Sequence, residues 1–349
     1  MRKTAGKGLK FLVMSLTGCC NLACKYCYAT GQAAEPMSFD TARRIIDMVA
    51  AGSNAWTLQF SGGEPLLEYD LLKAIVSYIK NKDIDVRFQL QTNGTLLTEE
   101  MARYFKREKI GIGVSLDGMP EVNDKTRRFP NGRGASASVL HGIELLKNEG
   151  VAIGLTSVLT SENVKELTKL VEFAYYLGNV RRLGIDLLRG QGRGENLTSA
   201  GSEVFEEYIR AFRRSEELAK LFGYKIKFSQ VEQAASLARN CVGSFAHCEA
   251  MDMSGLHVDA KGRFYACSSF VGDEYYCVGD AVCGIDEGRW IELSAVMRER
   301  MATCQSCGEL KSCGGACYAR CVGNGGRPPC AECGLKKAAA LLINFTKNY

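Results

Sequence analysis

Short apolar runs alternate with amphipathic stretches over the first half of the chain. The apolar runs have the length and residue types of β-strands, and they lie at residues 10–16, 55–60, 86–90, 110–116, 151–159 and 182–188. Between them, apolar positions recur with the period of a helix at residues 38–51, 67–80, 98–107, 135–148 and 161–177. Several of these helix patterns begin with Ser or Thr at the N-cap position. The pattern therefore predicts six repeated strand-helix units.

This repetition predicts an α/β fold with a parallel sheet. Right-handed crossovers would curl the sheet into a partial (β/α)6 barrel of the TIM type. In such a barrel, ligands bind at the carboxyl ends of the strands. Cysteine-rich, glycine-rich or polar segments follow four of the predicted strands at that end, at residues 19–27, 61–65, 92–94 and 115–118.

The pattern changes after the sixth predicted strand. A glycine-rich loop at residues 189–194 precedes a charged helix at about residues 202–222. From residue 241 onward Gly and Cys dominate, and only residues 335–344 have a clear helical pattern. We therefore expect a barrel at residues 1–200, a helical linker at 201–240 and a small Cys-rich, metal-binding domain at 241–349.

Composition narrows the classes of protein that this chain can belong to. No stretch approaches the roughly 20 apolar residues of a membrane span, and the N-terminus lacks a signal-peptide core, so a cytoplasmic location is expected. The net charge of +5 is spread over helical stretches beside acidic residues, which does not indicate nucleic-acid binding.

The 16 cysteines are the most unusual feature of the composition. Four lie at residues 19–27 and twelve at residues 241–333, with none between. Disulfides are not expected in the cytosol, and only three histidines are present, so soft thiolate-rich metal sites are favoured. The distribution predicts two metal-bearing regions separated by a cysteine-free scaffold.

Cys20, Cys24 and Cys27 follow the first predicted strand and would supply three thiolates without a fourth. Closed structural sites use four protein ligands, whereas a site with one free position can bind and activate a ligand. Free thiols on a loop, or a zinc site completed from elsewhere, are the alternatives. Cys19 lies outside the spacing.

With aromatic Tyr26 before the last cysteine, this motif resembles the Cys-x3-Cys-x-aromatic-Cys signature of the radical S-adenosylmethionine (radical SAM) superfamily. The resemblance implies that the three cysteines hold a 4Fe-4S cluster whose open iron binds SAM. Reductive cleavage of SAM would then release a 5'-deoxyadenosyl radical that abstracts hydrogen from the substrate.

The same resemblance assigns further cofactor-binding positions. Gly62, Gly63, Glu64 and Pro65 match the family's Gly-Gly-Glu-Pro turn, which would face the SAM amine. Asn93 would contact the ribose, and Ser115 with Arg127 the SAM carboxylate; Arg128 and Arg133 in the same loop are alternatives for the arginine. Asp117 is expected to organise its own loop.

The cysteines after residue 241 resemble the SPASM extension of radical SAM enzymes, which carries two auxiliary 4Fe-4S clusters. The resemblance implies an outer cluster on Cys304, Cys307, Cys313 and Cys333, with Cys330 as the alternative last ligand. An inner cluster would use Cys248, Cys267 and Cys317, and its fourth ligand could be Cys241, Cys277, Cys283 or none. A pair of four-cysteine zinc ribbons is the competing interpretation.

Relatives with this architecture modify peptides or proteins, so the resemblance implies a peptide or protein substrate and a flavodoxin- or ferredoxin-type electron donor. A thioether or carbon-carbon crosslink is the preferred product. Formylglycine formation is demoted, because Ser268 follows Cys267 where sulfatase maturases carry an Asp that accepts a proton, and a hydroxyl is a poor base.

Two further points concern the substrate and the chemistry. Fewer than twenty residues precede Cys20, so no leader-binding domain is expected there, and recognition would use the barrel mouth, residues 189–194 or a partner. No catalytic base is named, because the cofactor carries the chemistry. A non-catalytic, zinc-stabilised binding protein is the alternative from another class.

Overall fold

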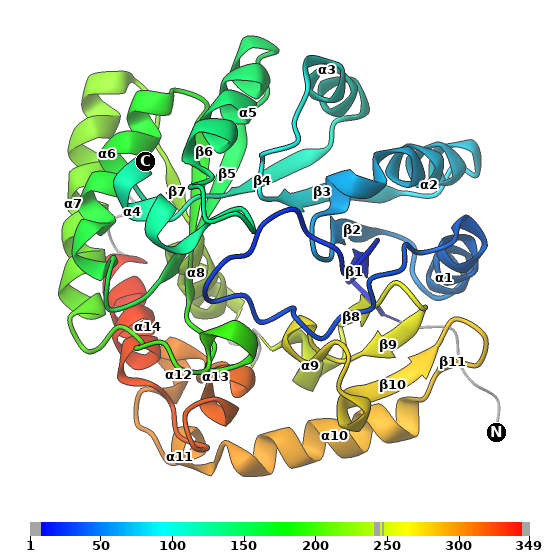
Figure 1. Cartoon of the computed structure of the whole chain (residues 1–349). Coiled ribbons are helices and arrows are strands. Elements are labelled where there is room, and N and C mark those ends of the chain that lie inside the picture. The colour runs from blue at the N-terminus through cyan, green and yellow to red at the C-terminus, as the bar shows by residue number, and fades with distance from the viewer. Residues whose placement is uncertain (1–7, 241–244, 246–247, 344–349) are drawn as a thin grey trace.

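The computed structural model describes residues 8–240, 245 and 248–343, and its centre is one sheet of 11 strands in the order β11-β10-β9-β8-β1-β2-β3-β4-β5-β6-β7. The strands are β1 (Phe11–Ser15), β2 (Trp56–Ser61), β3 (Val86–Thr92), β4 (Gly111–Ser115), β5 (Ile153–Leu159), β6 (Val180–Leu187), β7 (Lys227–Phe228), β8 (Gly255–Val258), β9 (Arg263–Tyr265), β10 (Cys277–Asp280) and β11 (Gly284–Ile285). Figure 1 shows the sheet curving around a central opening, with helices on its outer side.

The helices are α1 (Phe39–Gly52), α2 (Tyr69–Asn81), α3 (Glu99–Glu108), α4 (Pro120–Thr126), α5 (Ser136–Asn148), α6 (Leu167–Leu177), α7 (Val204–Phe222), α8 (Ser229–Asn240), α9 (Glu249–Asp252), α10 (Glu287–Arg300), α11 (Ala302–Gln305), α12 (Leu310–Cys313), α13 (Tyr318–Val322) and α14 (Cys330–Leu342). Short 3-10 turns lie at Pro65–Glu68, Val164–Glu166, Gly192–Gly194, Ser268–Phe270 and Glu274–Tyr276. Among the described residues, no helix is both long enough and apolar enough to cross a bilayer.

The predicted partial barrel is confirmed. Strands β1 to β6 pair in parallel and in chain order, and each is followed by the helix that the pattern predicts. Ser38 and Thr98 cap α1 and α3, since their side chains accept from the backbone N–H groups of Thr41 and Met101. These caps explain why both helices begin where the sequence predicts.

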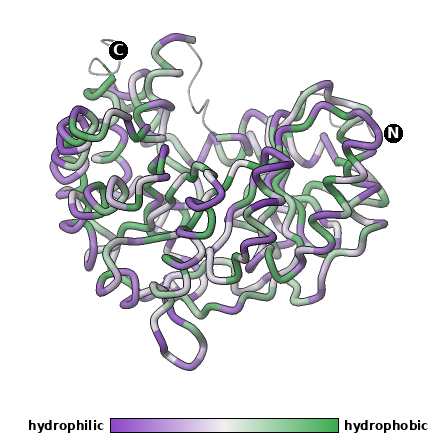
Figure 2. Tube along the Cα trace, turned by 90° about the horizontal axis from the view of Figure 1, so that it is seen from above, coloured by the Kyte–Doolittle hydropathy of each residue, from purple (hydrophilic) through white to green (hydrophobic). Residues whose placement is uncertain are grey.

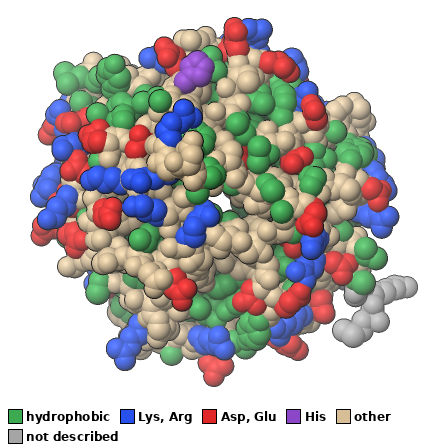
Figure 3. Space-filling model, in the orientation of Figure 1, with side chains coloured by type: hydrophobic (Ala, Val, Ile, Leu, Met, Phe, Trp, Pro, Cys, Tyr) green, Lys and Arg blue, Asp and Glu red, His purple; other side chains and the backbone are tan. Residues whose placement is uncertain are grey.

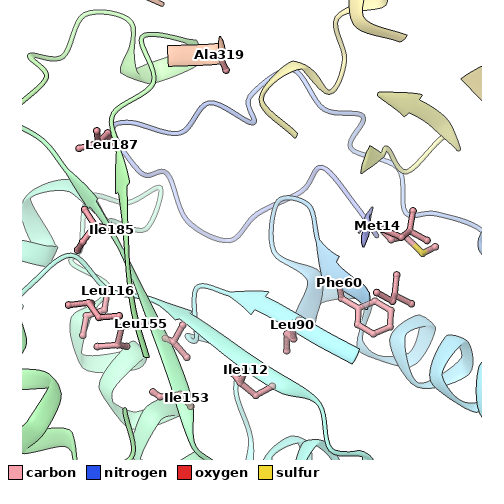
Figure 4. Packing of buried hydrophobic residues seen from close by; sticks show 14 of the residues in the cluster. Met14, Phe60, Leu90, Ile112, Leu116, Ile153, Leu155, Ile185, Leu187 and Ala319 are labelled. Carbon is pink, nitrogen blue, oxygen red and sulfur yellow. The ribbon is translucent and has the colours of Figure 1, made fainter. Parts of the chain in front are cut away.

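The core lies between the sheet and the outer helices. Alternate residues of each barrel strand, such as Phe60, Leu90 and Ile112, are buried among the helices (Figure 4). The intervening positions of β2 to β6 are mostly small or polar, including Gln59, Gln91 and Gly113. Hydrophobic and hydrophilic residues also alternate along the outer helices (Figure 2). The lumen is therefore a polar space bounded by a hydrophobic shell.

The part of the chain after residue 241 is more regular than its sequence predicts. Its strand β8 pairs in parallel with β1, so the sheet runs on from the barrel into β9, β10 and β11. The expectation of one helix beyond residue 241 was wrong, because α10 has 14 residues. Its buried face is a narrow stripe of Trp290, Leu293 and Met297 beside the exposed Ile291, which weakens the helical pattern.

Candidate functional site

The loop between β1 and α1 carries the first cysteine group, and backbone hydrogen bonds hold it on three sides. The N–H groups of Gly63 and Glu64 donate to the carbonyls of Thr17 and Cys19, each at 2.8 Å. On another side, Ala23 and Lys25 donate to the carbonyls of Arg128 and Thr126 at 2.6 and 2.9 Å. On the third, the N–H of Arg193 donates to the Cys27 carbonyl at 3.0 Å, and its Nε to the Cys24 carbonyl at 2.8 Å.

The three thiols of this loop line one cavity and are near enough to act on one another's charge. Burial, together with negative charge on Glu64, Cys24 and Cys27, raises the pKa of Cys20 to about 11, although the hydrogen bond from the Leu22 N–H lowers it. Burial also raises the pKa of Cys24, while the charge of Arg127 lowers it. Three neighbouring thiolates repel one another, so a cationic metal centre would favour their ionised form.

The turn after β2 needs glycine for steric reasons. Gly62 has a φ of +129°, and a Cβ there would overlap the Thr17 carbonyl. A Cβ on Gly63 would overlap the carbonyl of Cys19. The two glycines therefore let the end of β2 lie directly against the cysteine loop.

Glu64 is buried, and Pro65 begins the 3-10 turn that follows it in the chain. The buried Glu64 carboxylate accepts from Thr92 Oγ1 at 2.6 Å and from the backbone N–H groups of Asn93 and Leu66 at 2.7 and 3.1 Å. Burial raises its pKa to about 7 although these hydrogen bonds lower it. Glu64 thus joins the turns that follow β2 and β3.

Asn93 and Ser115 lie at the ends of β3 and β4 and line the same cavity as the cysteines. Asn93 Nδ2 donates to Asn21 Oδ1 at 2.8 Å and lies 3.7 Å from Cys20 Sγ. Ser115 Oγ accepts from Gln91 Nε2 at 3.1 Å. Both side chains are held by neighbours while they face the cavity.

Asp117 organises the loop after β4, as the sequence predicts. Its Oδ2 accepts from Tyr26 Oη, from Thr126 Oγ1 at 3.0 Å and from Arg127 Nε at 3.0 Å. Its Oδ1 accepts from Arg127 Nη2 at 3.2 Å and from the Val158 N–H at 3.0 Å. The guanidinium of Arg127 also lies 5.3 Å from the centre of the Tyr26 ring.

Arg127 is the arginine of its loop that reaches the site. It is buried and lines the cavity, whereas Arg128 donates to the Asp124 carbonyl at 2.7 Å and Arg133 is exposed above the Phe129 ring. Because Arg127 is paired with Asp117, most of its charge is already compensated.

A cavity of about 260 Å³ brings most of the predicted SAM-site residues together. Its lining includes Cys20, Cys24, Tyr26, Cys27, Gly62, Gly63, Asn93, Ser115 and Arg127. Glu64 and Pro65 are not among the described residues that line it. Figure 3 shows a hollow at the centre of this face, with Lys or Arg side chains beside it.

The outer cysteine group gathers around the start of α14. Burial raises the pKa of Cys304, and charge on Cys313 and Cys307 raises it further. Burial, with charge on Cys304 and Cys313, likewise raises the pKa of Cys333. Cys333 therefore lies beside the group, and both it and Cys330, the first residue of α14, are exposed.

The inner group lines a second cavity of about 250 Å³, to which Cys248, Cys267, Cys317 and Ser268 all contribute. Burial, with charge on Cys267 and Cys317, raises the pKa of Cys248 to about 12. Of the candidates for a fourth ligand, Cys241 lies outside the described residues. Cys277 donates to the Gly279 carbonyl at 3.4 Å and Cys283 is exposed, and neither is among the described residues lining this cavity.

Two residues near the inner group were not singled out from the sequence. His257 on β8 lines the second cavity, and burial together with Arg189 lowers its pKa to about 3. Cys321 is buried beside Cys304, Cys317 and Cys333. Burial, together with the charges of these three cysteines, raises the pKa of Cys321 to about 12. The Cys-x3-Cys spacing from Cys317 to Cys321, which directly follows that from Cys313 to Cys317, is the sequence signal that could have found it.

A buried ion-pair network joins the barrel to the C-terminal region. Asp186, at the end of β6, accepts from Arg189 Nη2 at 3.0 Å and from Arg320 Nη2 at 2.6 Å. Burial opposes ionisation of Asp186, but the two arginines lower its pKa to about 2. Arg320 also donates to Glu332 on α14. Asp186 was not singled out from the sequence. Its position as a polar residue at the carboxyl end of a strand is the feature that could have identified it.

The donor chemistry of the first cavity fits an iron-sulfur cluster with SAM. Three thiolates are soft ligands, and glycine-flanked backbone, an amide and a hydroxyl line the space beside them. In the described part of the chain, no three His, Cys, Asp or Glu side chains are grouped so as to hold a single metal ion.

Comparison with known proteins points to one family. The model of the Radical SAM superfamily matches residues 14–174. Uncharacterized protein MJ0907 of Methanocaldococcus jannaschii is 31% identical over 78% of this chain and 89% of its own length. The cysteine-type anaerobic sulfatase-maturating enzyme of Clostridium novyi is 29% identical over 77% of this chain and 76% of its own. Fe-coproporphyrin III synthase of Methanosarcina barkeri is 34% identical, but over 46% of this chain and 40% of its own.

Solved structures show the same fold. A structure of anSMEcpe with bound AdoMet matches with a TM-score of 0.80 over 98% of this chain and 100% of that chain, at 19% identity. Streptococcus suis SuiB bound to its precursor peptide SuiA matches with a TM-score of 0.66 over 90% of this chain and 73% of that chain, at 16% identity. At these identities the likeness concerns the fold.

Proposed function

Because the chain belongs to the radical SAM superfamily, we propose that it is an oxidoreductase that modifies a ribosomally made peptide or protein. The preferred product is a thioether or carbon-carbon crosslink. A single observation carries the proposal: Cys20, Cys24 and Cys27 line one cavity together with the glycine turn after β2 and the ends of β3 and β4.

In this proposal, Cys20, Cys24 and Cys27 hold a 4Fe-4S cluster and the cavity beside them holds SAM. When bound and reduced, the pair supplies a 5'-deoxyadenosyl radical that abstracts a hydrogen atom from the substrate. The chain's own part is positioning and exclusion of water. Gly62 and Gly63 present backbone to the SAM amine, while Asn93 faces the ribose, and Ser115 and Arg127 face the SAM carboxylate.

The C-terminal region would be a SPASM domain with two auxiliary 4Fe-4S clusters. Cys304, Cys307, Cys313 and Cys333 would hold the outer one, and Cys248, Cys267 and Cys317 the inner one. The inner cysteines lie on the side of the barrel mouth where Arg189 and Asp186 are, which supports a role beside the substrate. A flavodoxin- or ferredoxin-type protein would deliver the electrons.

Replacing Cys20, Cys24 and Cys27 together by Ala tests the radical site. The reconstituted wild type should release 5'-deoxyadenosine from SAM under a strong reductant, and the triple variant should not. Cys19→Ala is the matched control, because the thiol of Cys19 donates to the Ala34 carbonyl outside the cavity. Undiminished release by the triple variant would refute the assignment.

Formylglycine formation is the second candidate function, since a sulfatase-maturating enzyme is among the similar proteins. Ser268, which follows Cys267 and lines the second cavity, argues against it because a hydroxyl is a poor base. Mass spectrometry of a Cys-type and a Ser-type sulfatase peptide after turnover distinguishes the reactions. Formylglycine on either peptide would replace the crosslink proposal.

Metal analysis tests the non-catalytic alternative. Protein purified without oxygen should carry about twelve iron atoms per chain if three 4Fe-4S clusters are present. Zinc with no iron would instead support a zinc-stabilised binding protein.

A further inference from the structure

Arg189 is a buried cation whose hydrogen-bonding capacity is only partly used by the protein. Its Nη2 donates to Asp186 Oδ2 at 3.0 Å, and its guanidinium lies 4.2 Å from the centre of the Tyr28 ring. Its side chain is 15% exposed. Among the described residues, its Nε and Nη1 are buried and have no hydrogen-bond partner. Buried donors of this kind normally meet an acceptor.

The position of Arg189 is between the two cavities. It lines the first cavity together with Cys20, Cys24 and Cys27. Its charge also lowers the pKa of His257 and of Cys267, which line the second cavity. A ligand bound at Arg189 would therefore lie in the first cavity, beside the space proposed for SAM and toward the inner cysteines.

The charges around Arg189 do not balance. Arg320 shares Asp186 with Arg189 and also pairs with Glu332, which lies 3.7 Å from Lys336 Nζ as well. Three cations thus surround two carboxylates. Arg127, the other arginine among the described residues of the first cavity, is instead paired bidentately with Asp117. Arg127 therefore has a carboxylate of its own, whereas Arg189 shares Asp186 with Arg320.

We propose that Arg189 binds a carboxylate of the substrate. The inference rests on the proposed function and names the chemistry of the group that the site receives. A guanidinium with free N–H donors that lies over an aromatic ring suits a carboxylate. A monoanion fits better than a phosphate dianion, since the adjacent Asp186 would repel a second negative charge.

Two sources would present this carboxylate. One is an acidic side chain or chain end of a peptide, as the proposed function requires. The other is a propionate of a tetrapyrrole, because a protein named Fe-coproporphyrin III synthase is similar to part of this chain. The chemistry at Arg189 is the same for both, and only the remainder of the ligand differs.

Equilibrium dialysis against anaerobically reconstituted, SAM-loaded enzyme tests the proposal. One arm compares N-acetylglutamate amide with the neutral N-acetylglutamine amide, and the other compares coproporphyrin III with its tetramethyl ester. The wild type should bind the carboxylate of at least one pair about 10- to 100-fold more tightly than its neutral partner, as expected for a charge-assisted hydrogen bond. The arm that shows this preference identifies the source.

Arg189→Gln should abolish the preference, whereas Arg181→Gln should leave it unchanged. Arg181 lies at the opposite end of β6, above the Tyr224 ring. If R189Q does not retain its iron, Arg189→Lys is used, because it keeps the positive charge beside Asp186 and loses the planar donors. The preference should then fall several-fold.

Two results would overturn the proposal: a wild type that shows no preference in either arm, or an R189Q variant that keeps the preference. If R189Q keeps the preference but weakens SAM binding or shifts the reduction potential of an auxiliary cluster, Arg189 is assigned to that group instead. Failure of the proposed function is separate: a wild type that releases no 5'-deoxyadenosine would refute it, and a preference in the porphyrin arm alone would replace its peptide substrate while the Arg189 proposal stands.

Discussion

Asp117→Asn should destabilise the protein strongly, because Asp117 is the counter-ion of the buried Arg127. Five donors converge on its two oxygens, from Tyr26, Thr126, Val158 and two nitrogens of Arg127. An Asn amide offers one oxygen and one NH2 group. Whichever way it is turned, at least two of these buried donors would face an NH2 group.

The magnitude follows from the buried charge. Removing one partner of a buried ion pair leaves the other uncompensated and costs about 3 to 5 kcal/mol. D117N should therefore lower the free energy of unfolding by about that amount. The double variant D117N/R127Q should recover part of it, since it removes the orphaned cation, giving a coupling energy of about 1 to 3 kcal/mol.

The assay is urea denaturation followed by circular dichroism, on preparations matched for iron content. Asp70→Asn is the control, because Asp70 pairs with Lys73 on an exposed helix face, where such a change costs about 0.5 kcal/mol or less. The reasoning fails if D117N costs less than about 1 kcal/mol. It also fails if the effects of D117N and R127Q simply add.

Gly63→Ala should lower iron incorporation and SAM cleavage at least about 10-fold, because a Cβ would overlap the cysteine loop; Gly31→Ala has open space and should match the wild type on iron assay. Burial raises the pKa of Glu64 to about 7, above its value in the unfolded chain, so its contribution to stability is complete below about pH 4.5 and lost as the pH rises through 7. Between pH 6 and 8.5 the wild type should therefore lose about 1 to 1.5 kcal/mol relative to Glu64→Gln in urea denaturation, and parallel curves would contradict this. Cys333→Ala should remove about four iron atoms per chain and Cys330→Ala none, and the reverse result would exchange their proposed roles.

The sequence predicts the barrel well because its signals are local. Each barrel strand alternates buried and lumen-facing positions or forms a short apolar run, and capping residues such as Ser38 mark the helix starts. The polar and glycine-rich segments after the strands follow from the rule that parallel strands end at one edge. By contrast, β8 has only four residues, and its pairing with β1 joins positions more than 240 residues apart.

The same division applies to the site. The spacing of Cys20, Cys24 and Cys27 and the turn at Gly62 and Gly63 are local motifs, so the sequence by itself determines them. Which cysteines meet near α14, and the position of Arg189 beside Asp186, depend on how distant segments pack.

Only the tertiary structure decides which charges are satisfied. Arg127 and Arg189 look alike in the sequence, but Asp117 engages the first bidentately, whereas Asp186 divides its charge between the second and Arg320. This difference in pairing matters because the side chains of both arginines are largely buried. In a poorly solvated site, an unpaired donor has no water to replace the missing partner. The cysteine and glycine motifs and the barrel thus follow from local sequence, whereas the charge that remains available to a ligand depends on which distant side chains the folded cavity brings together.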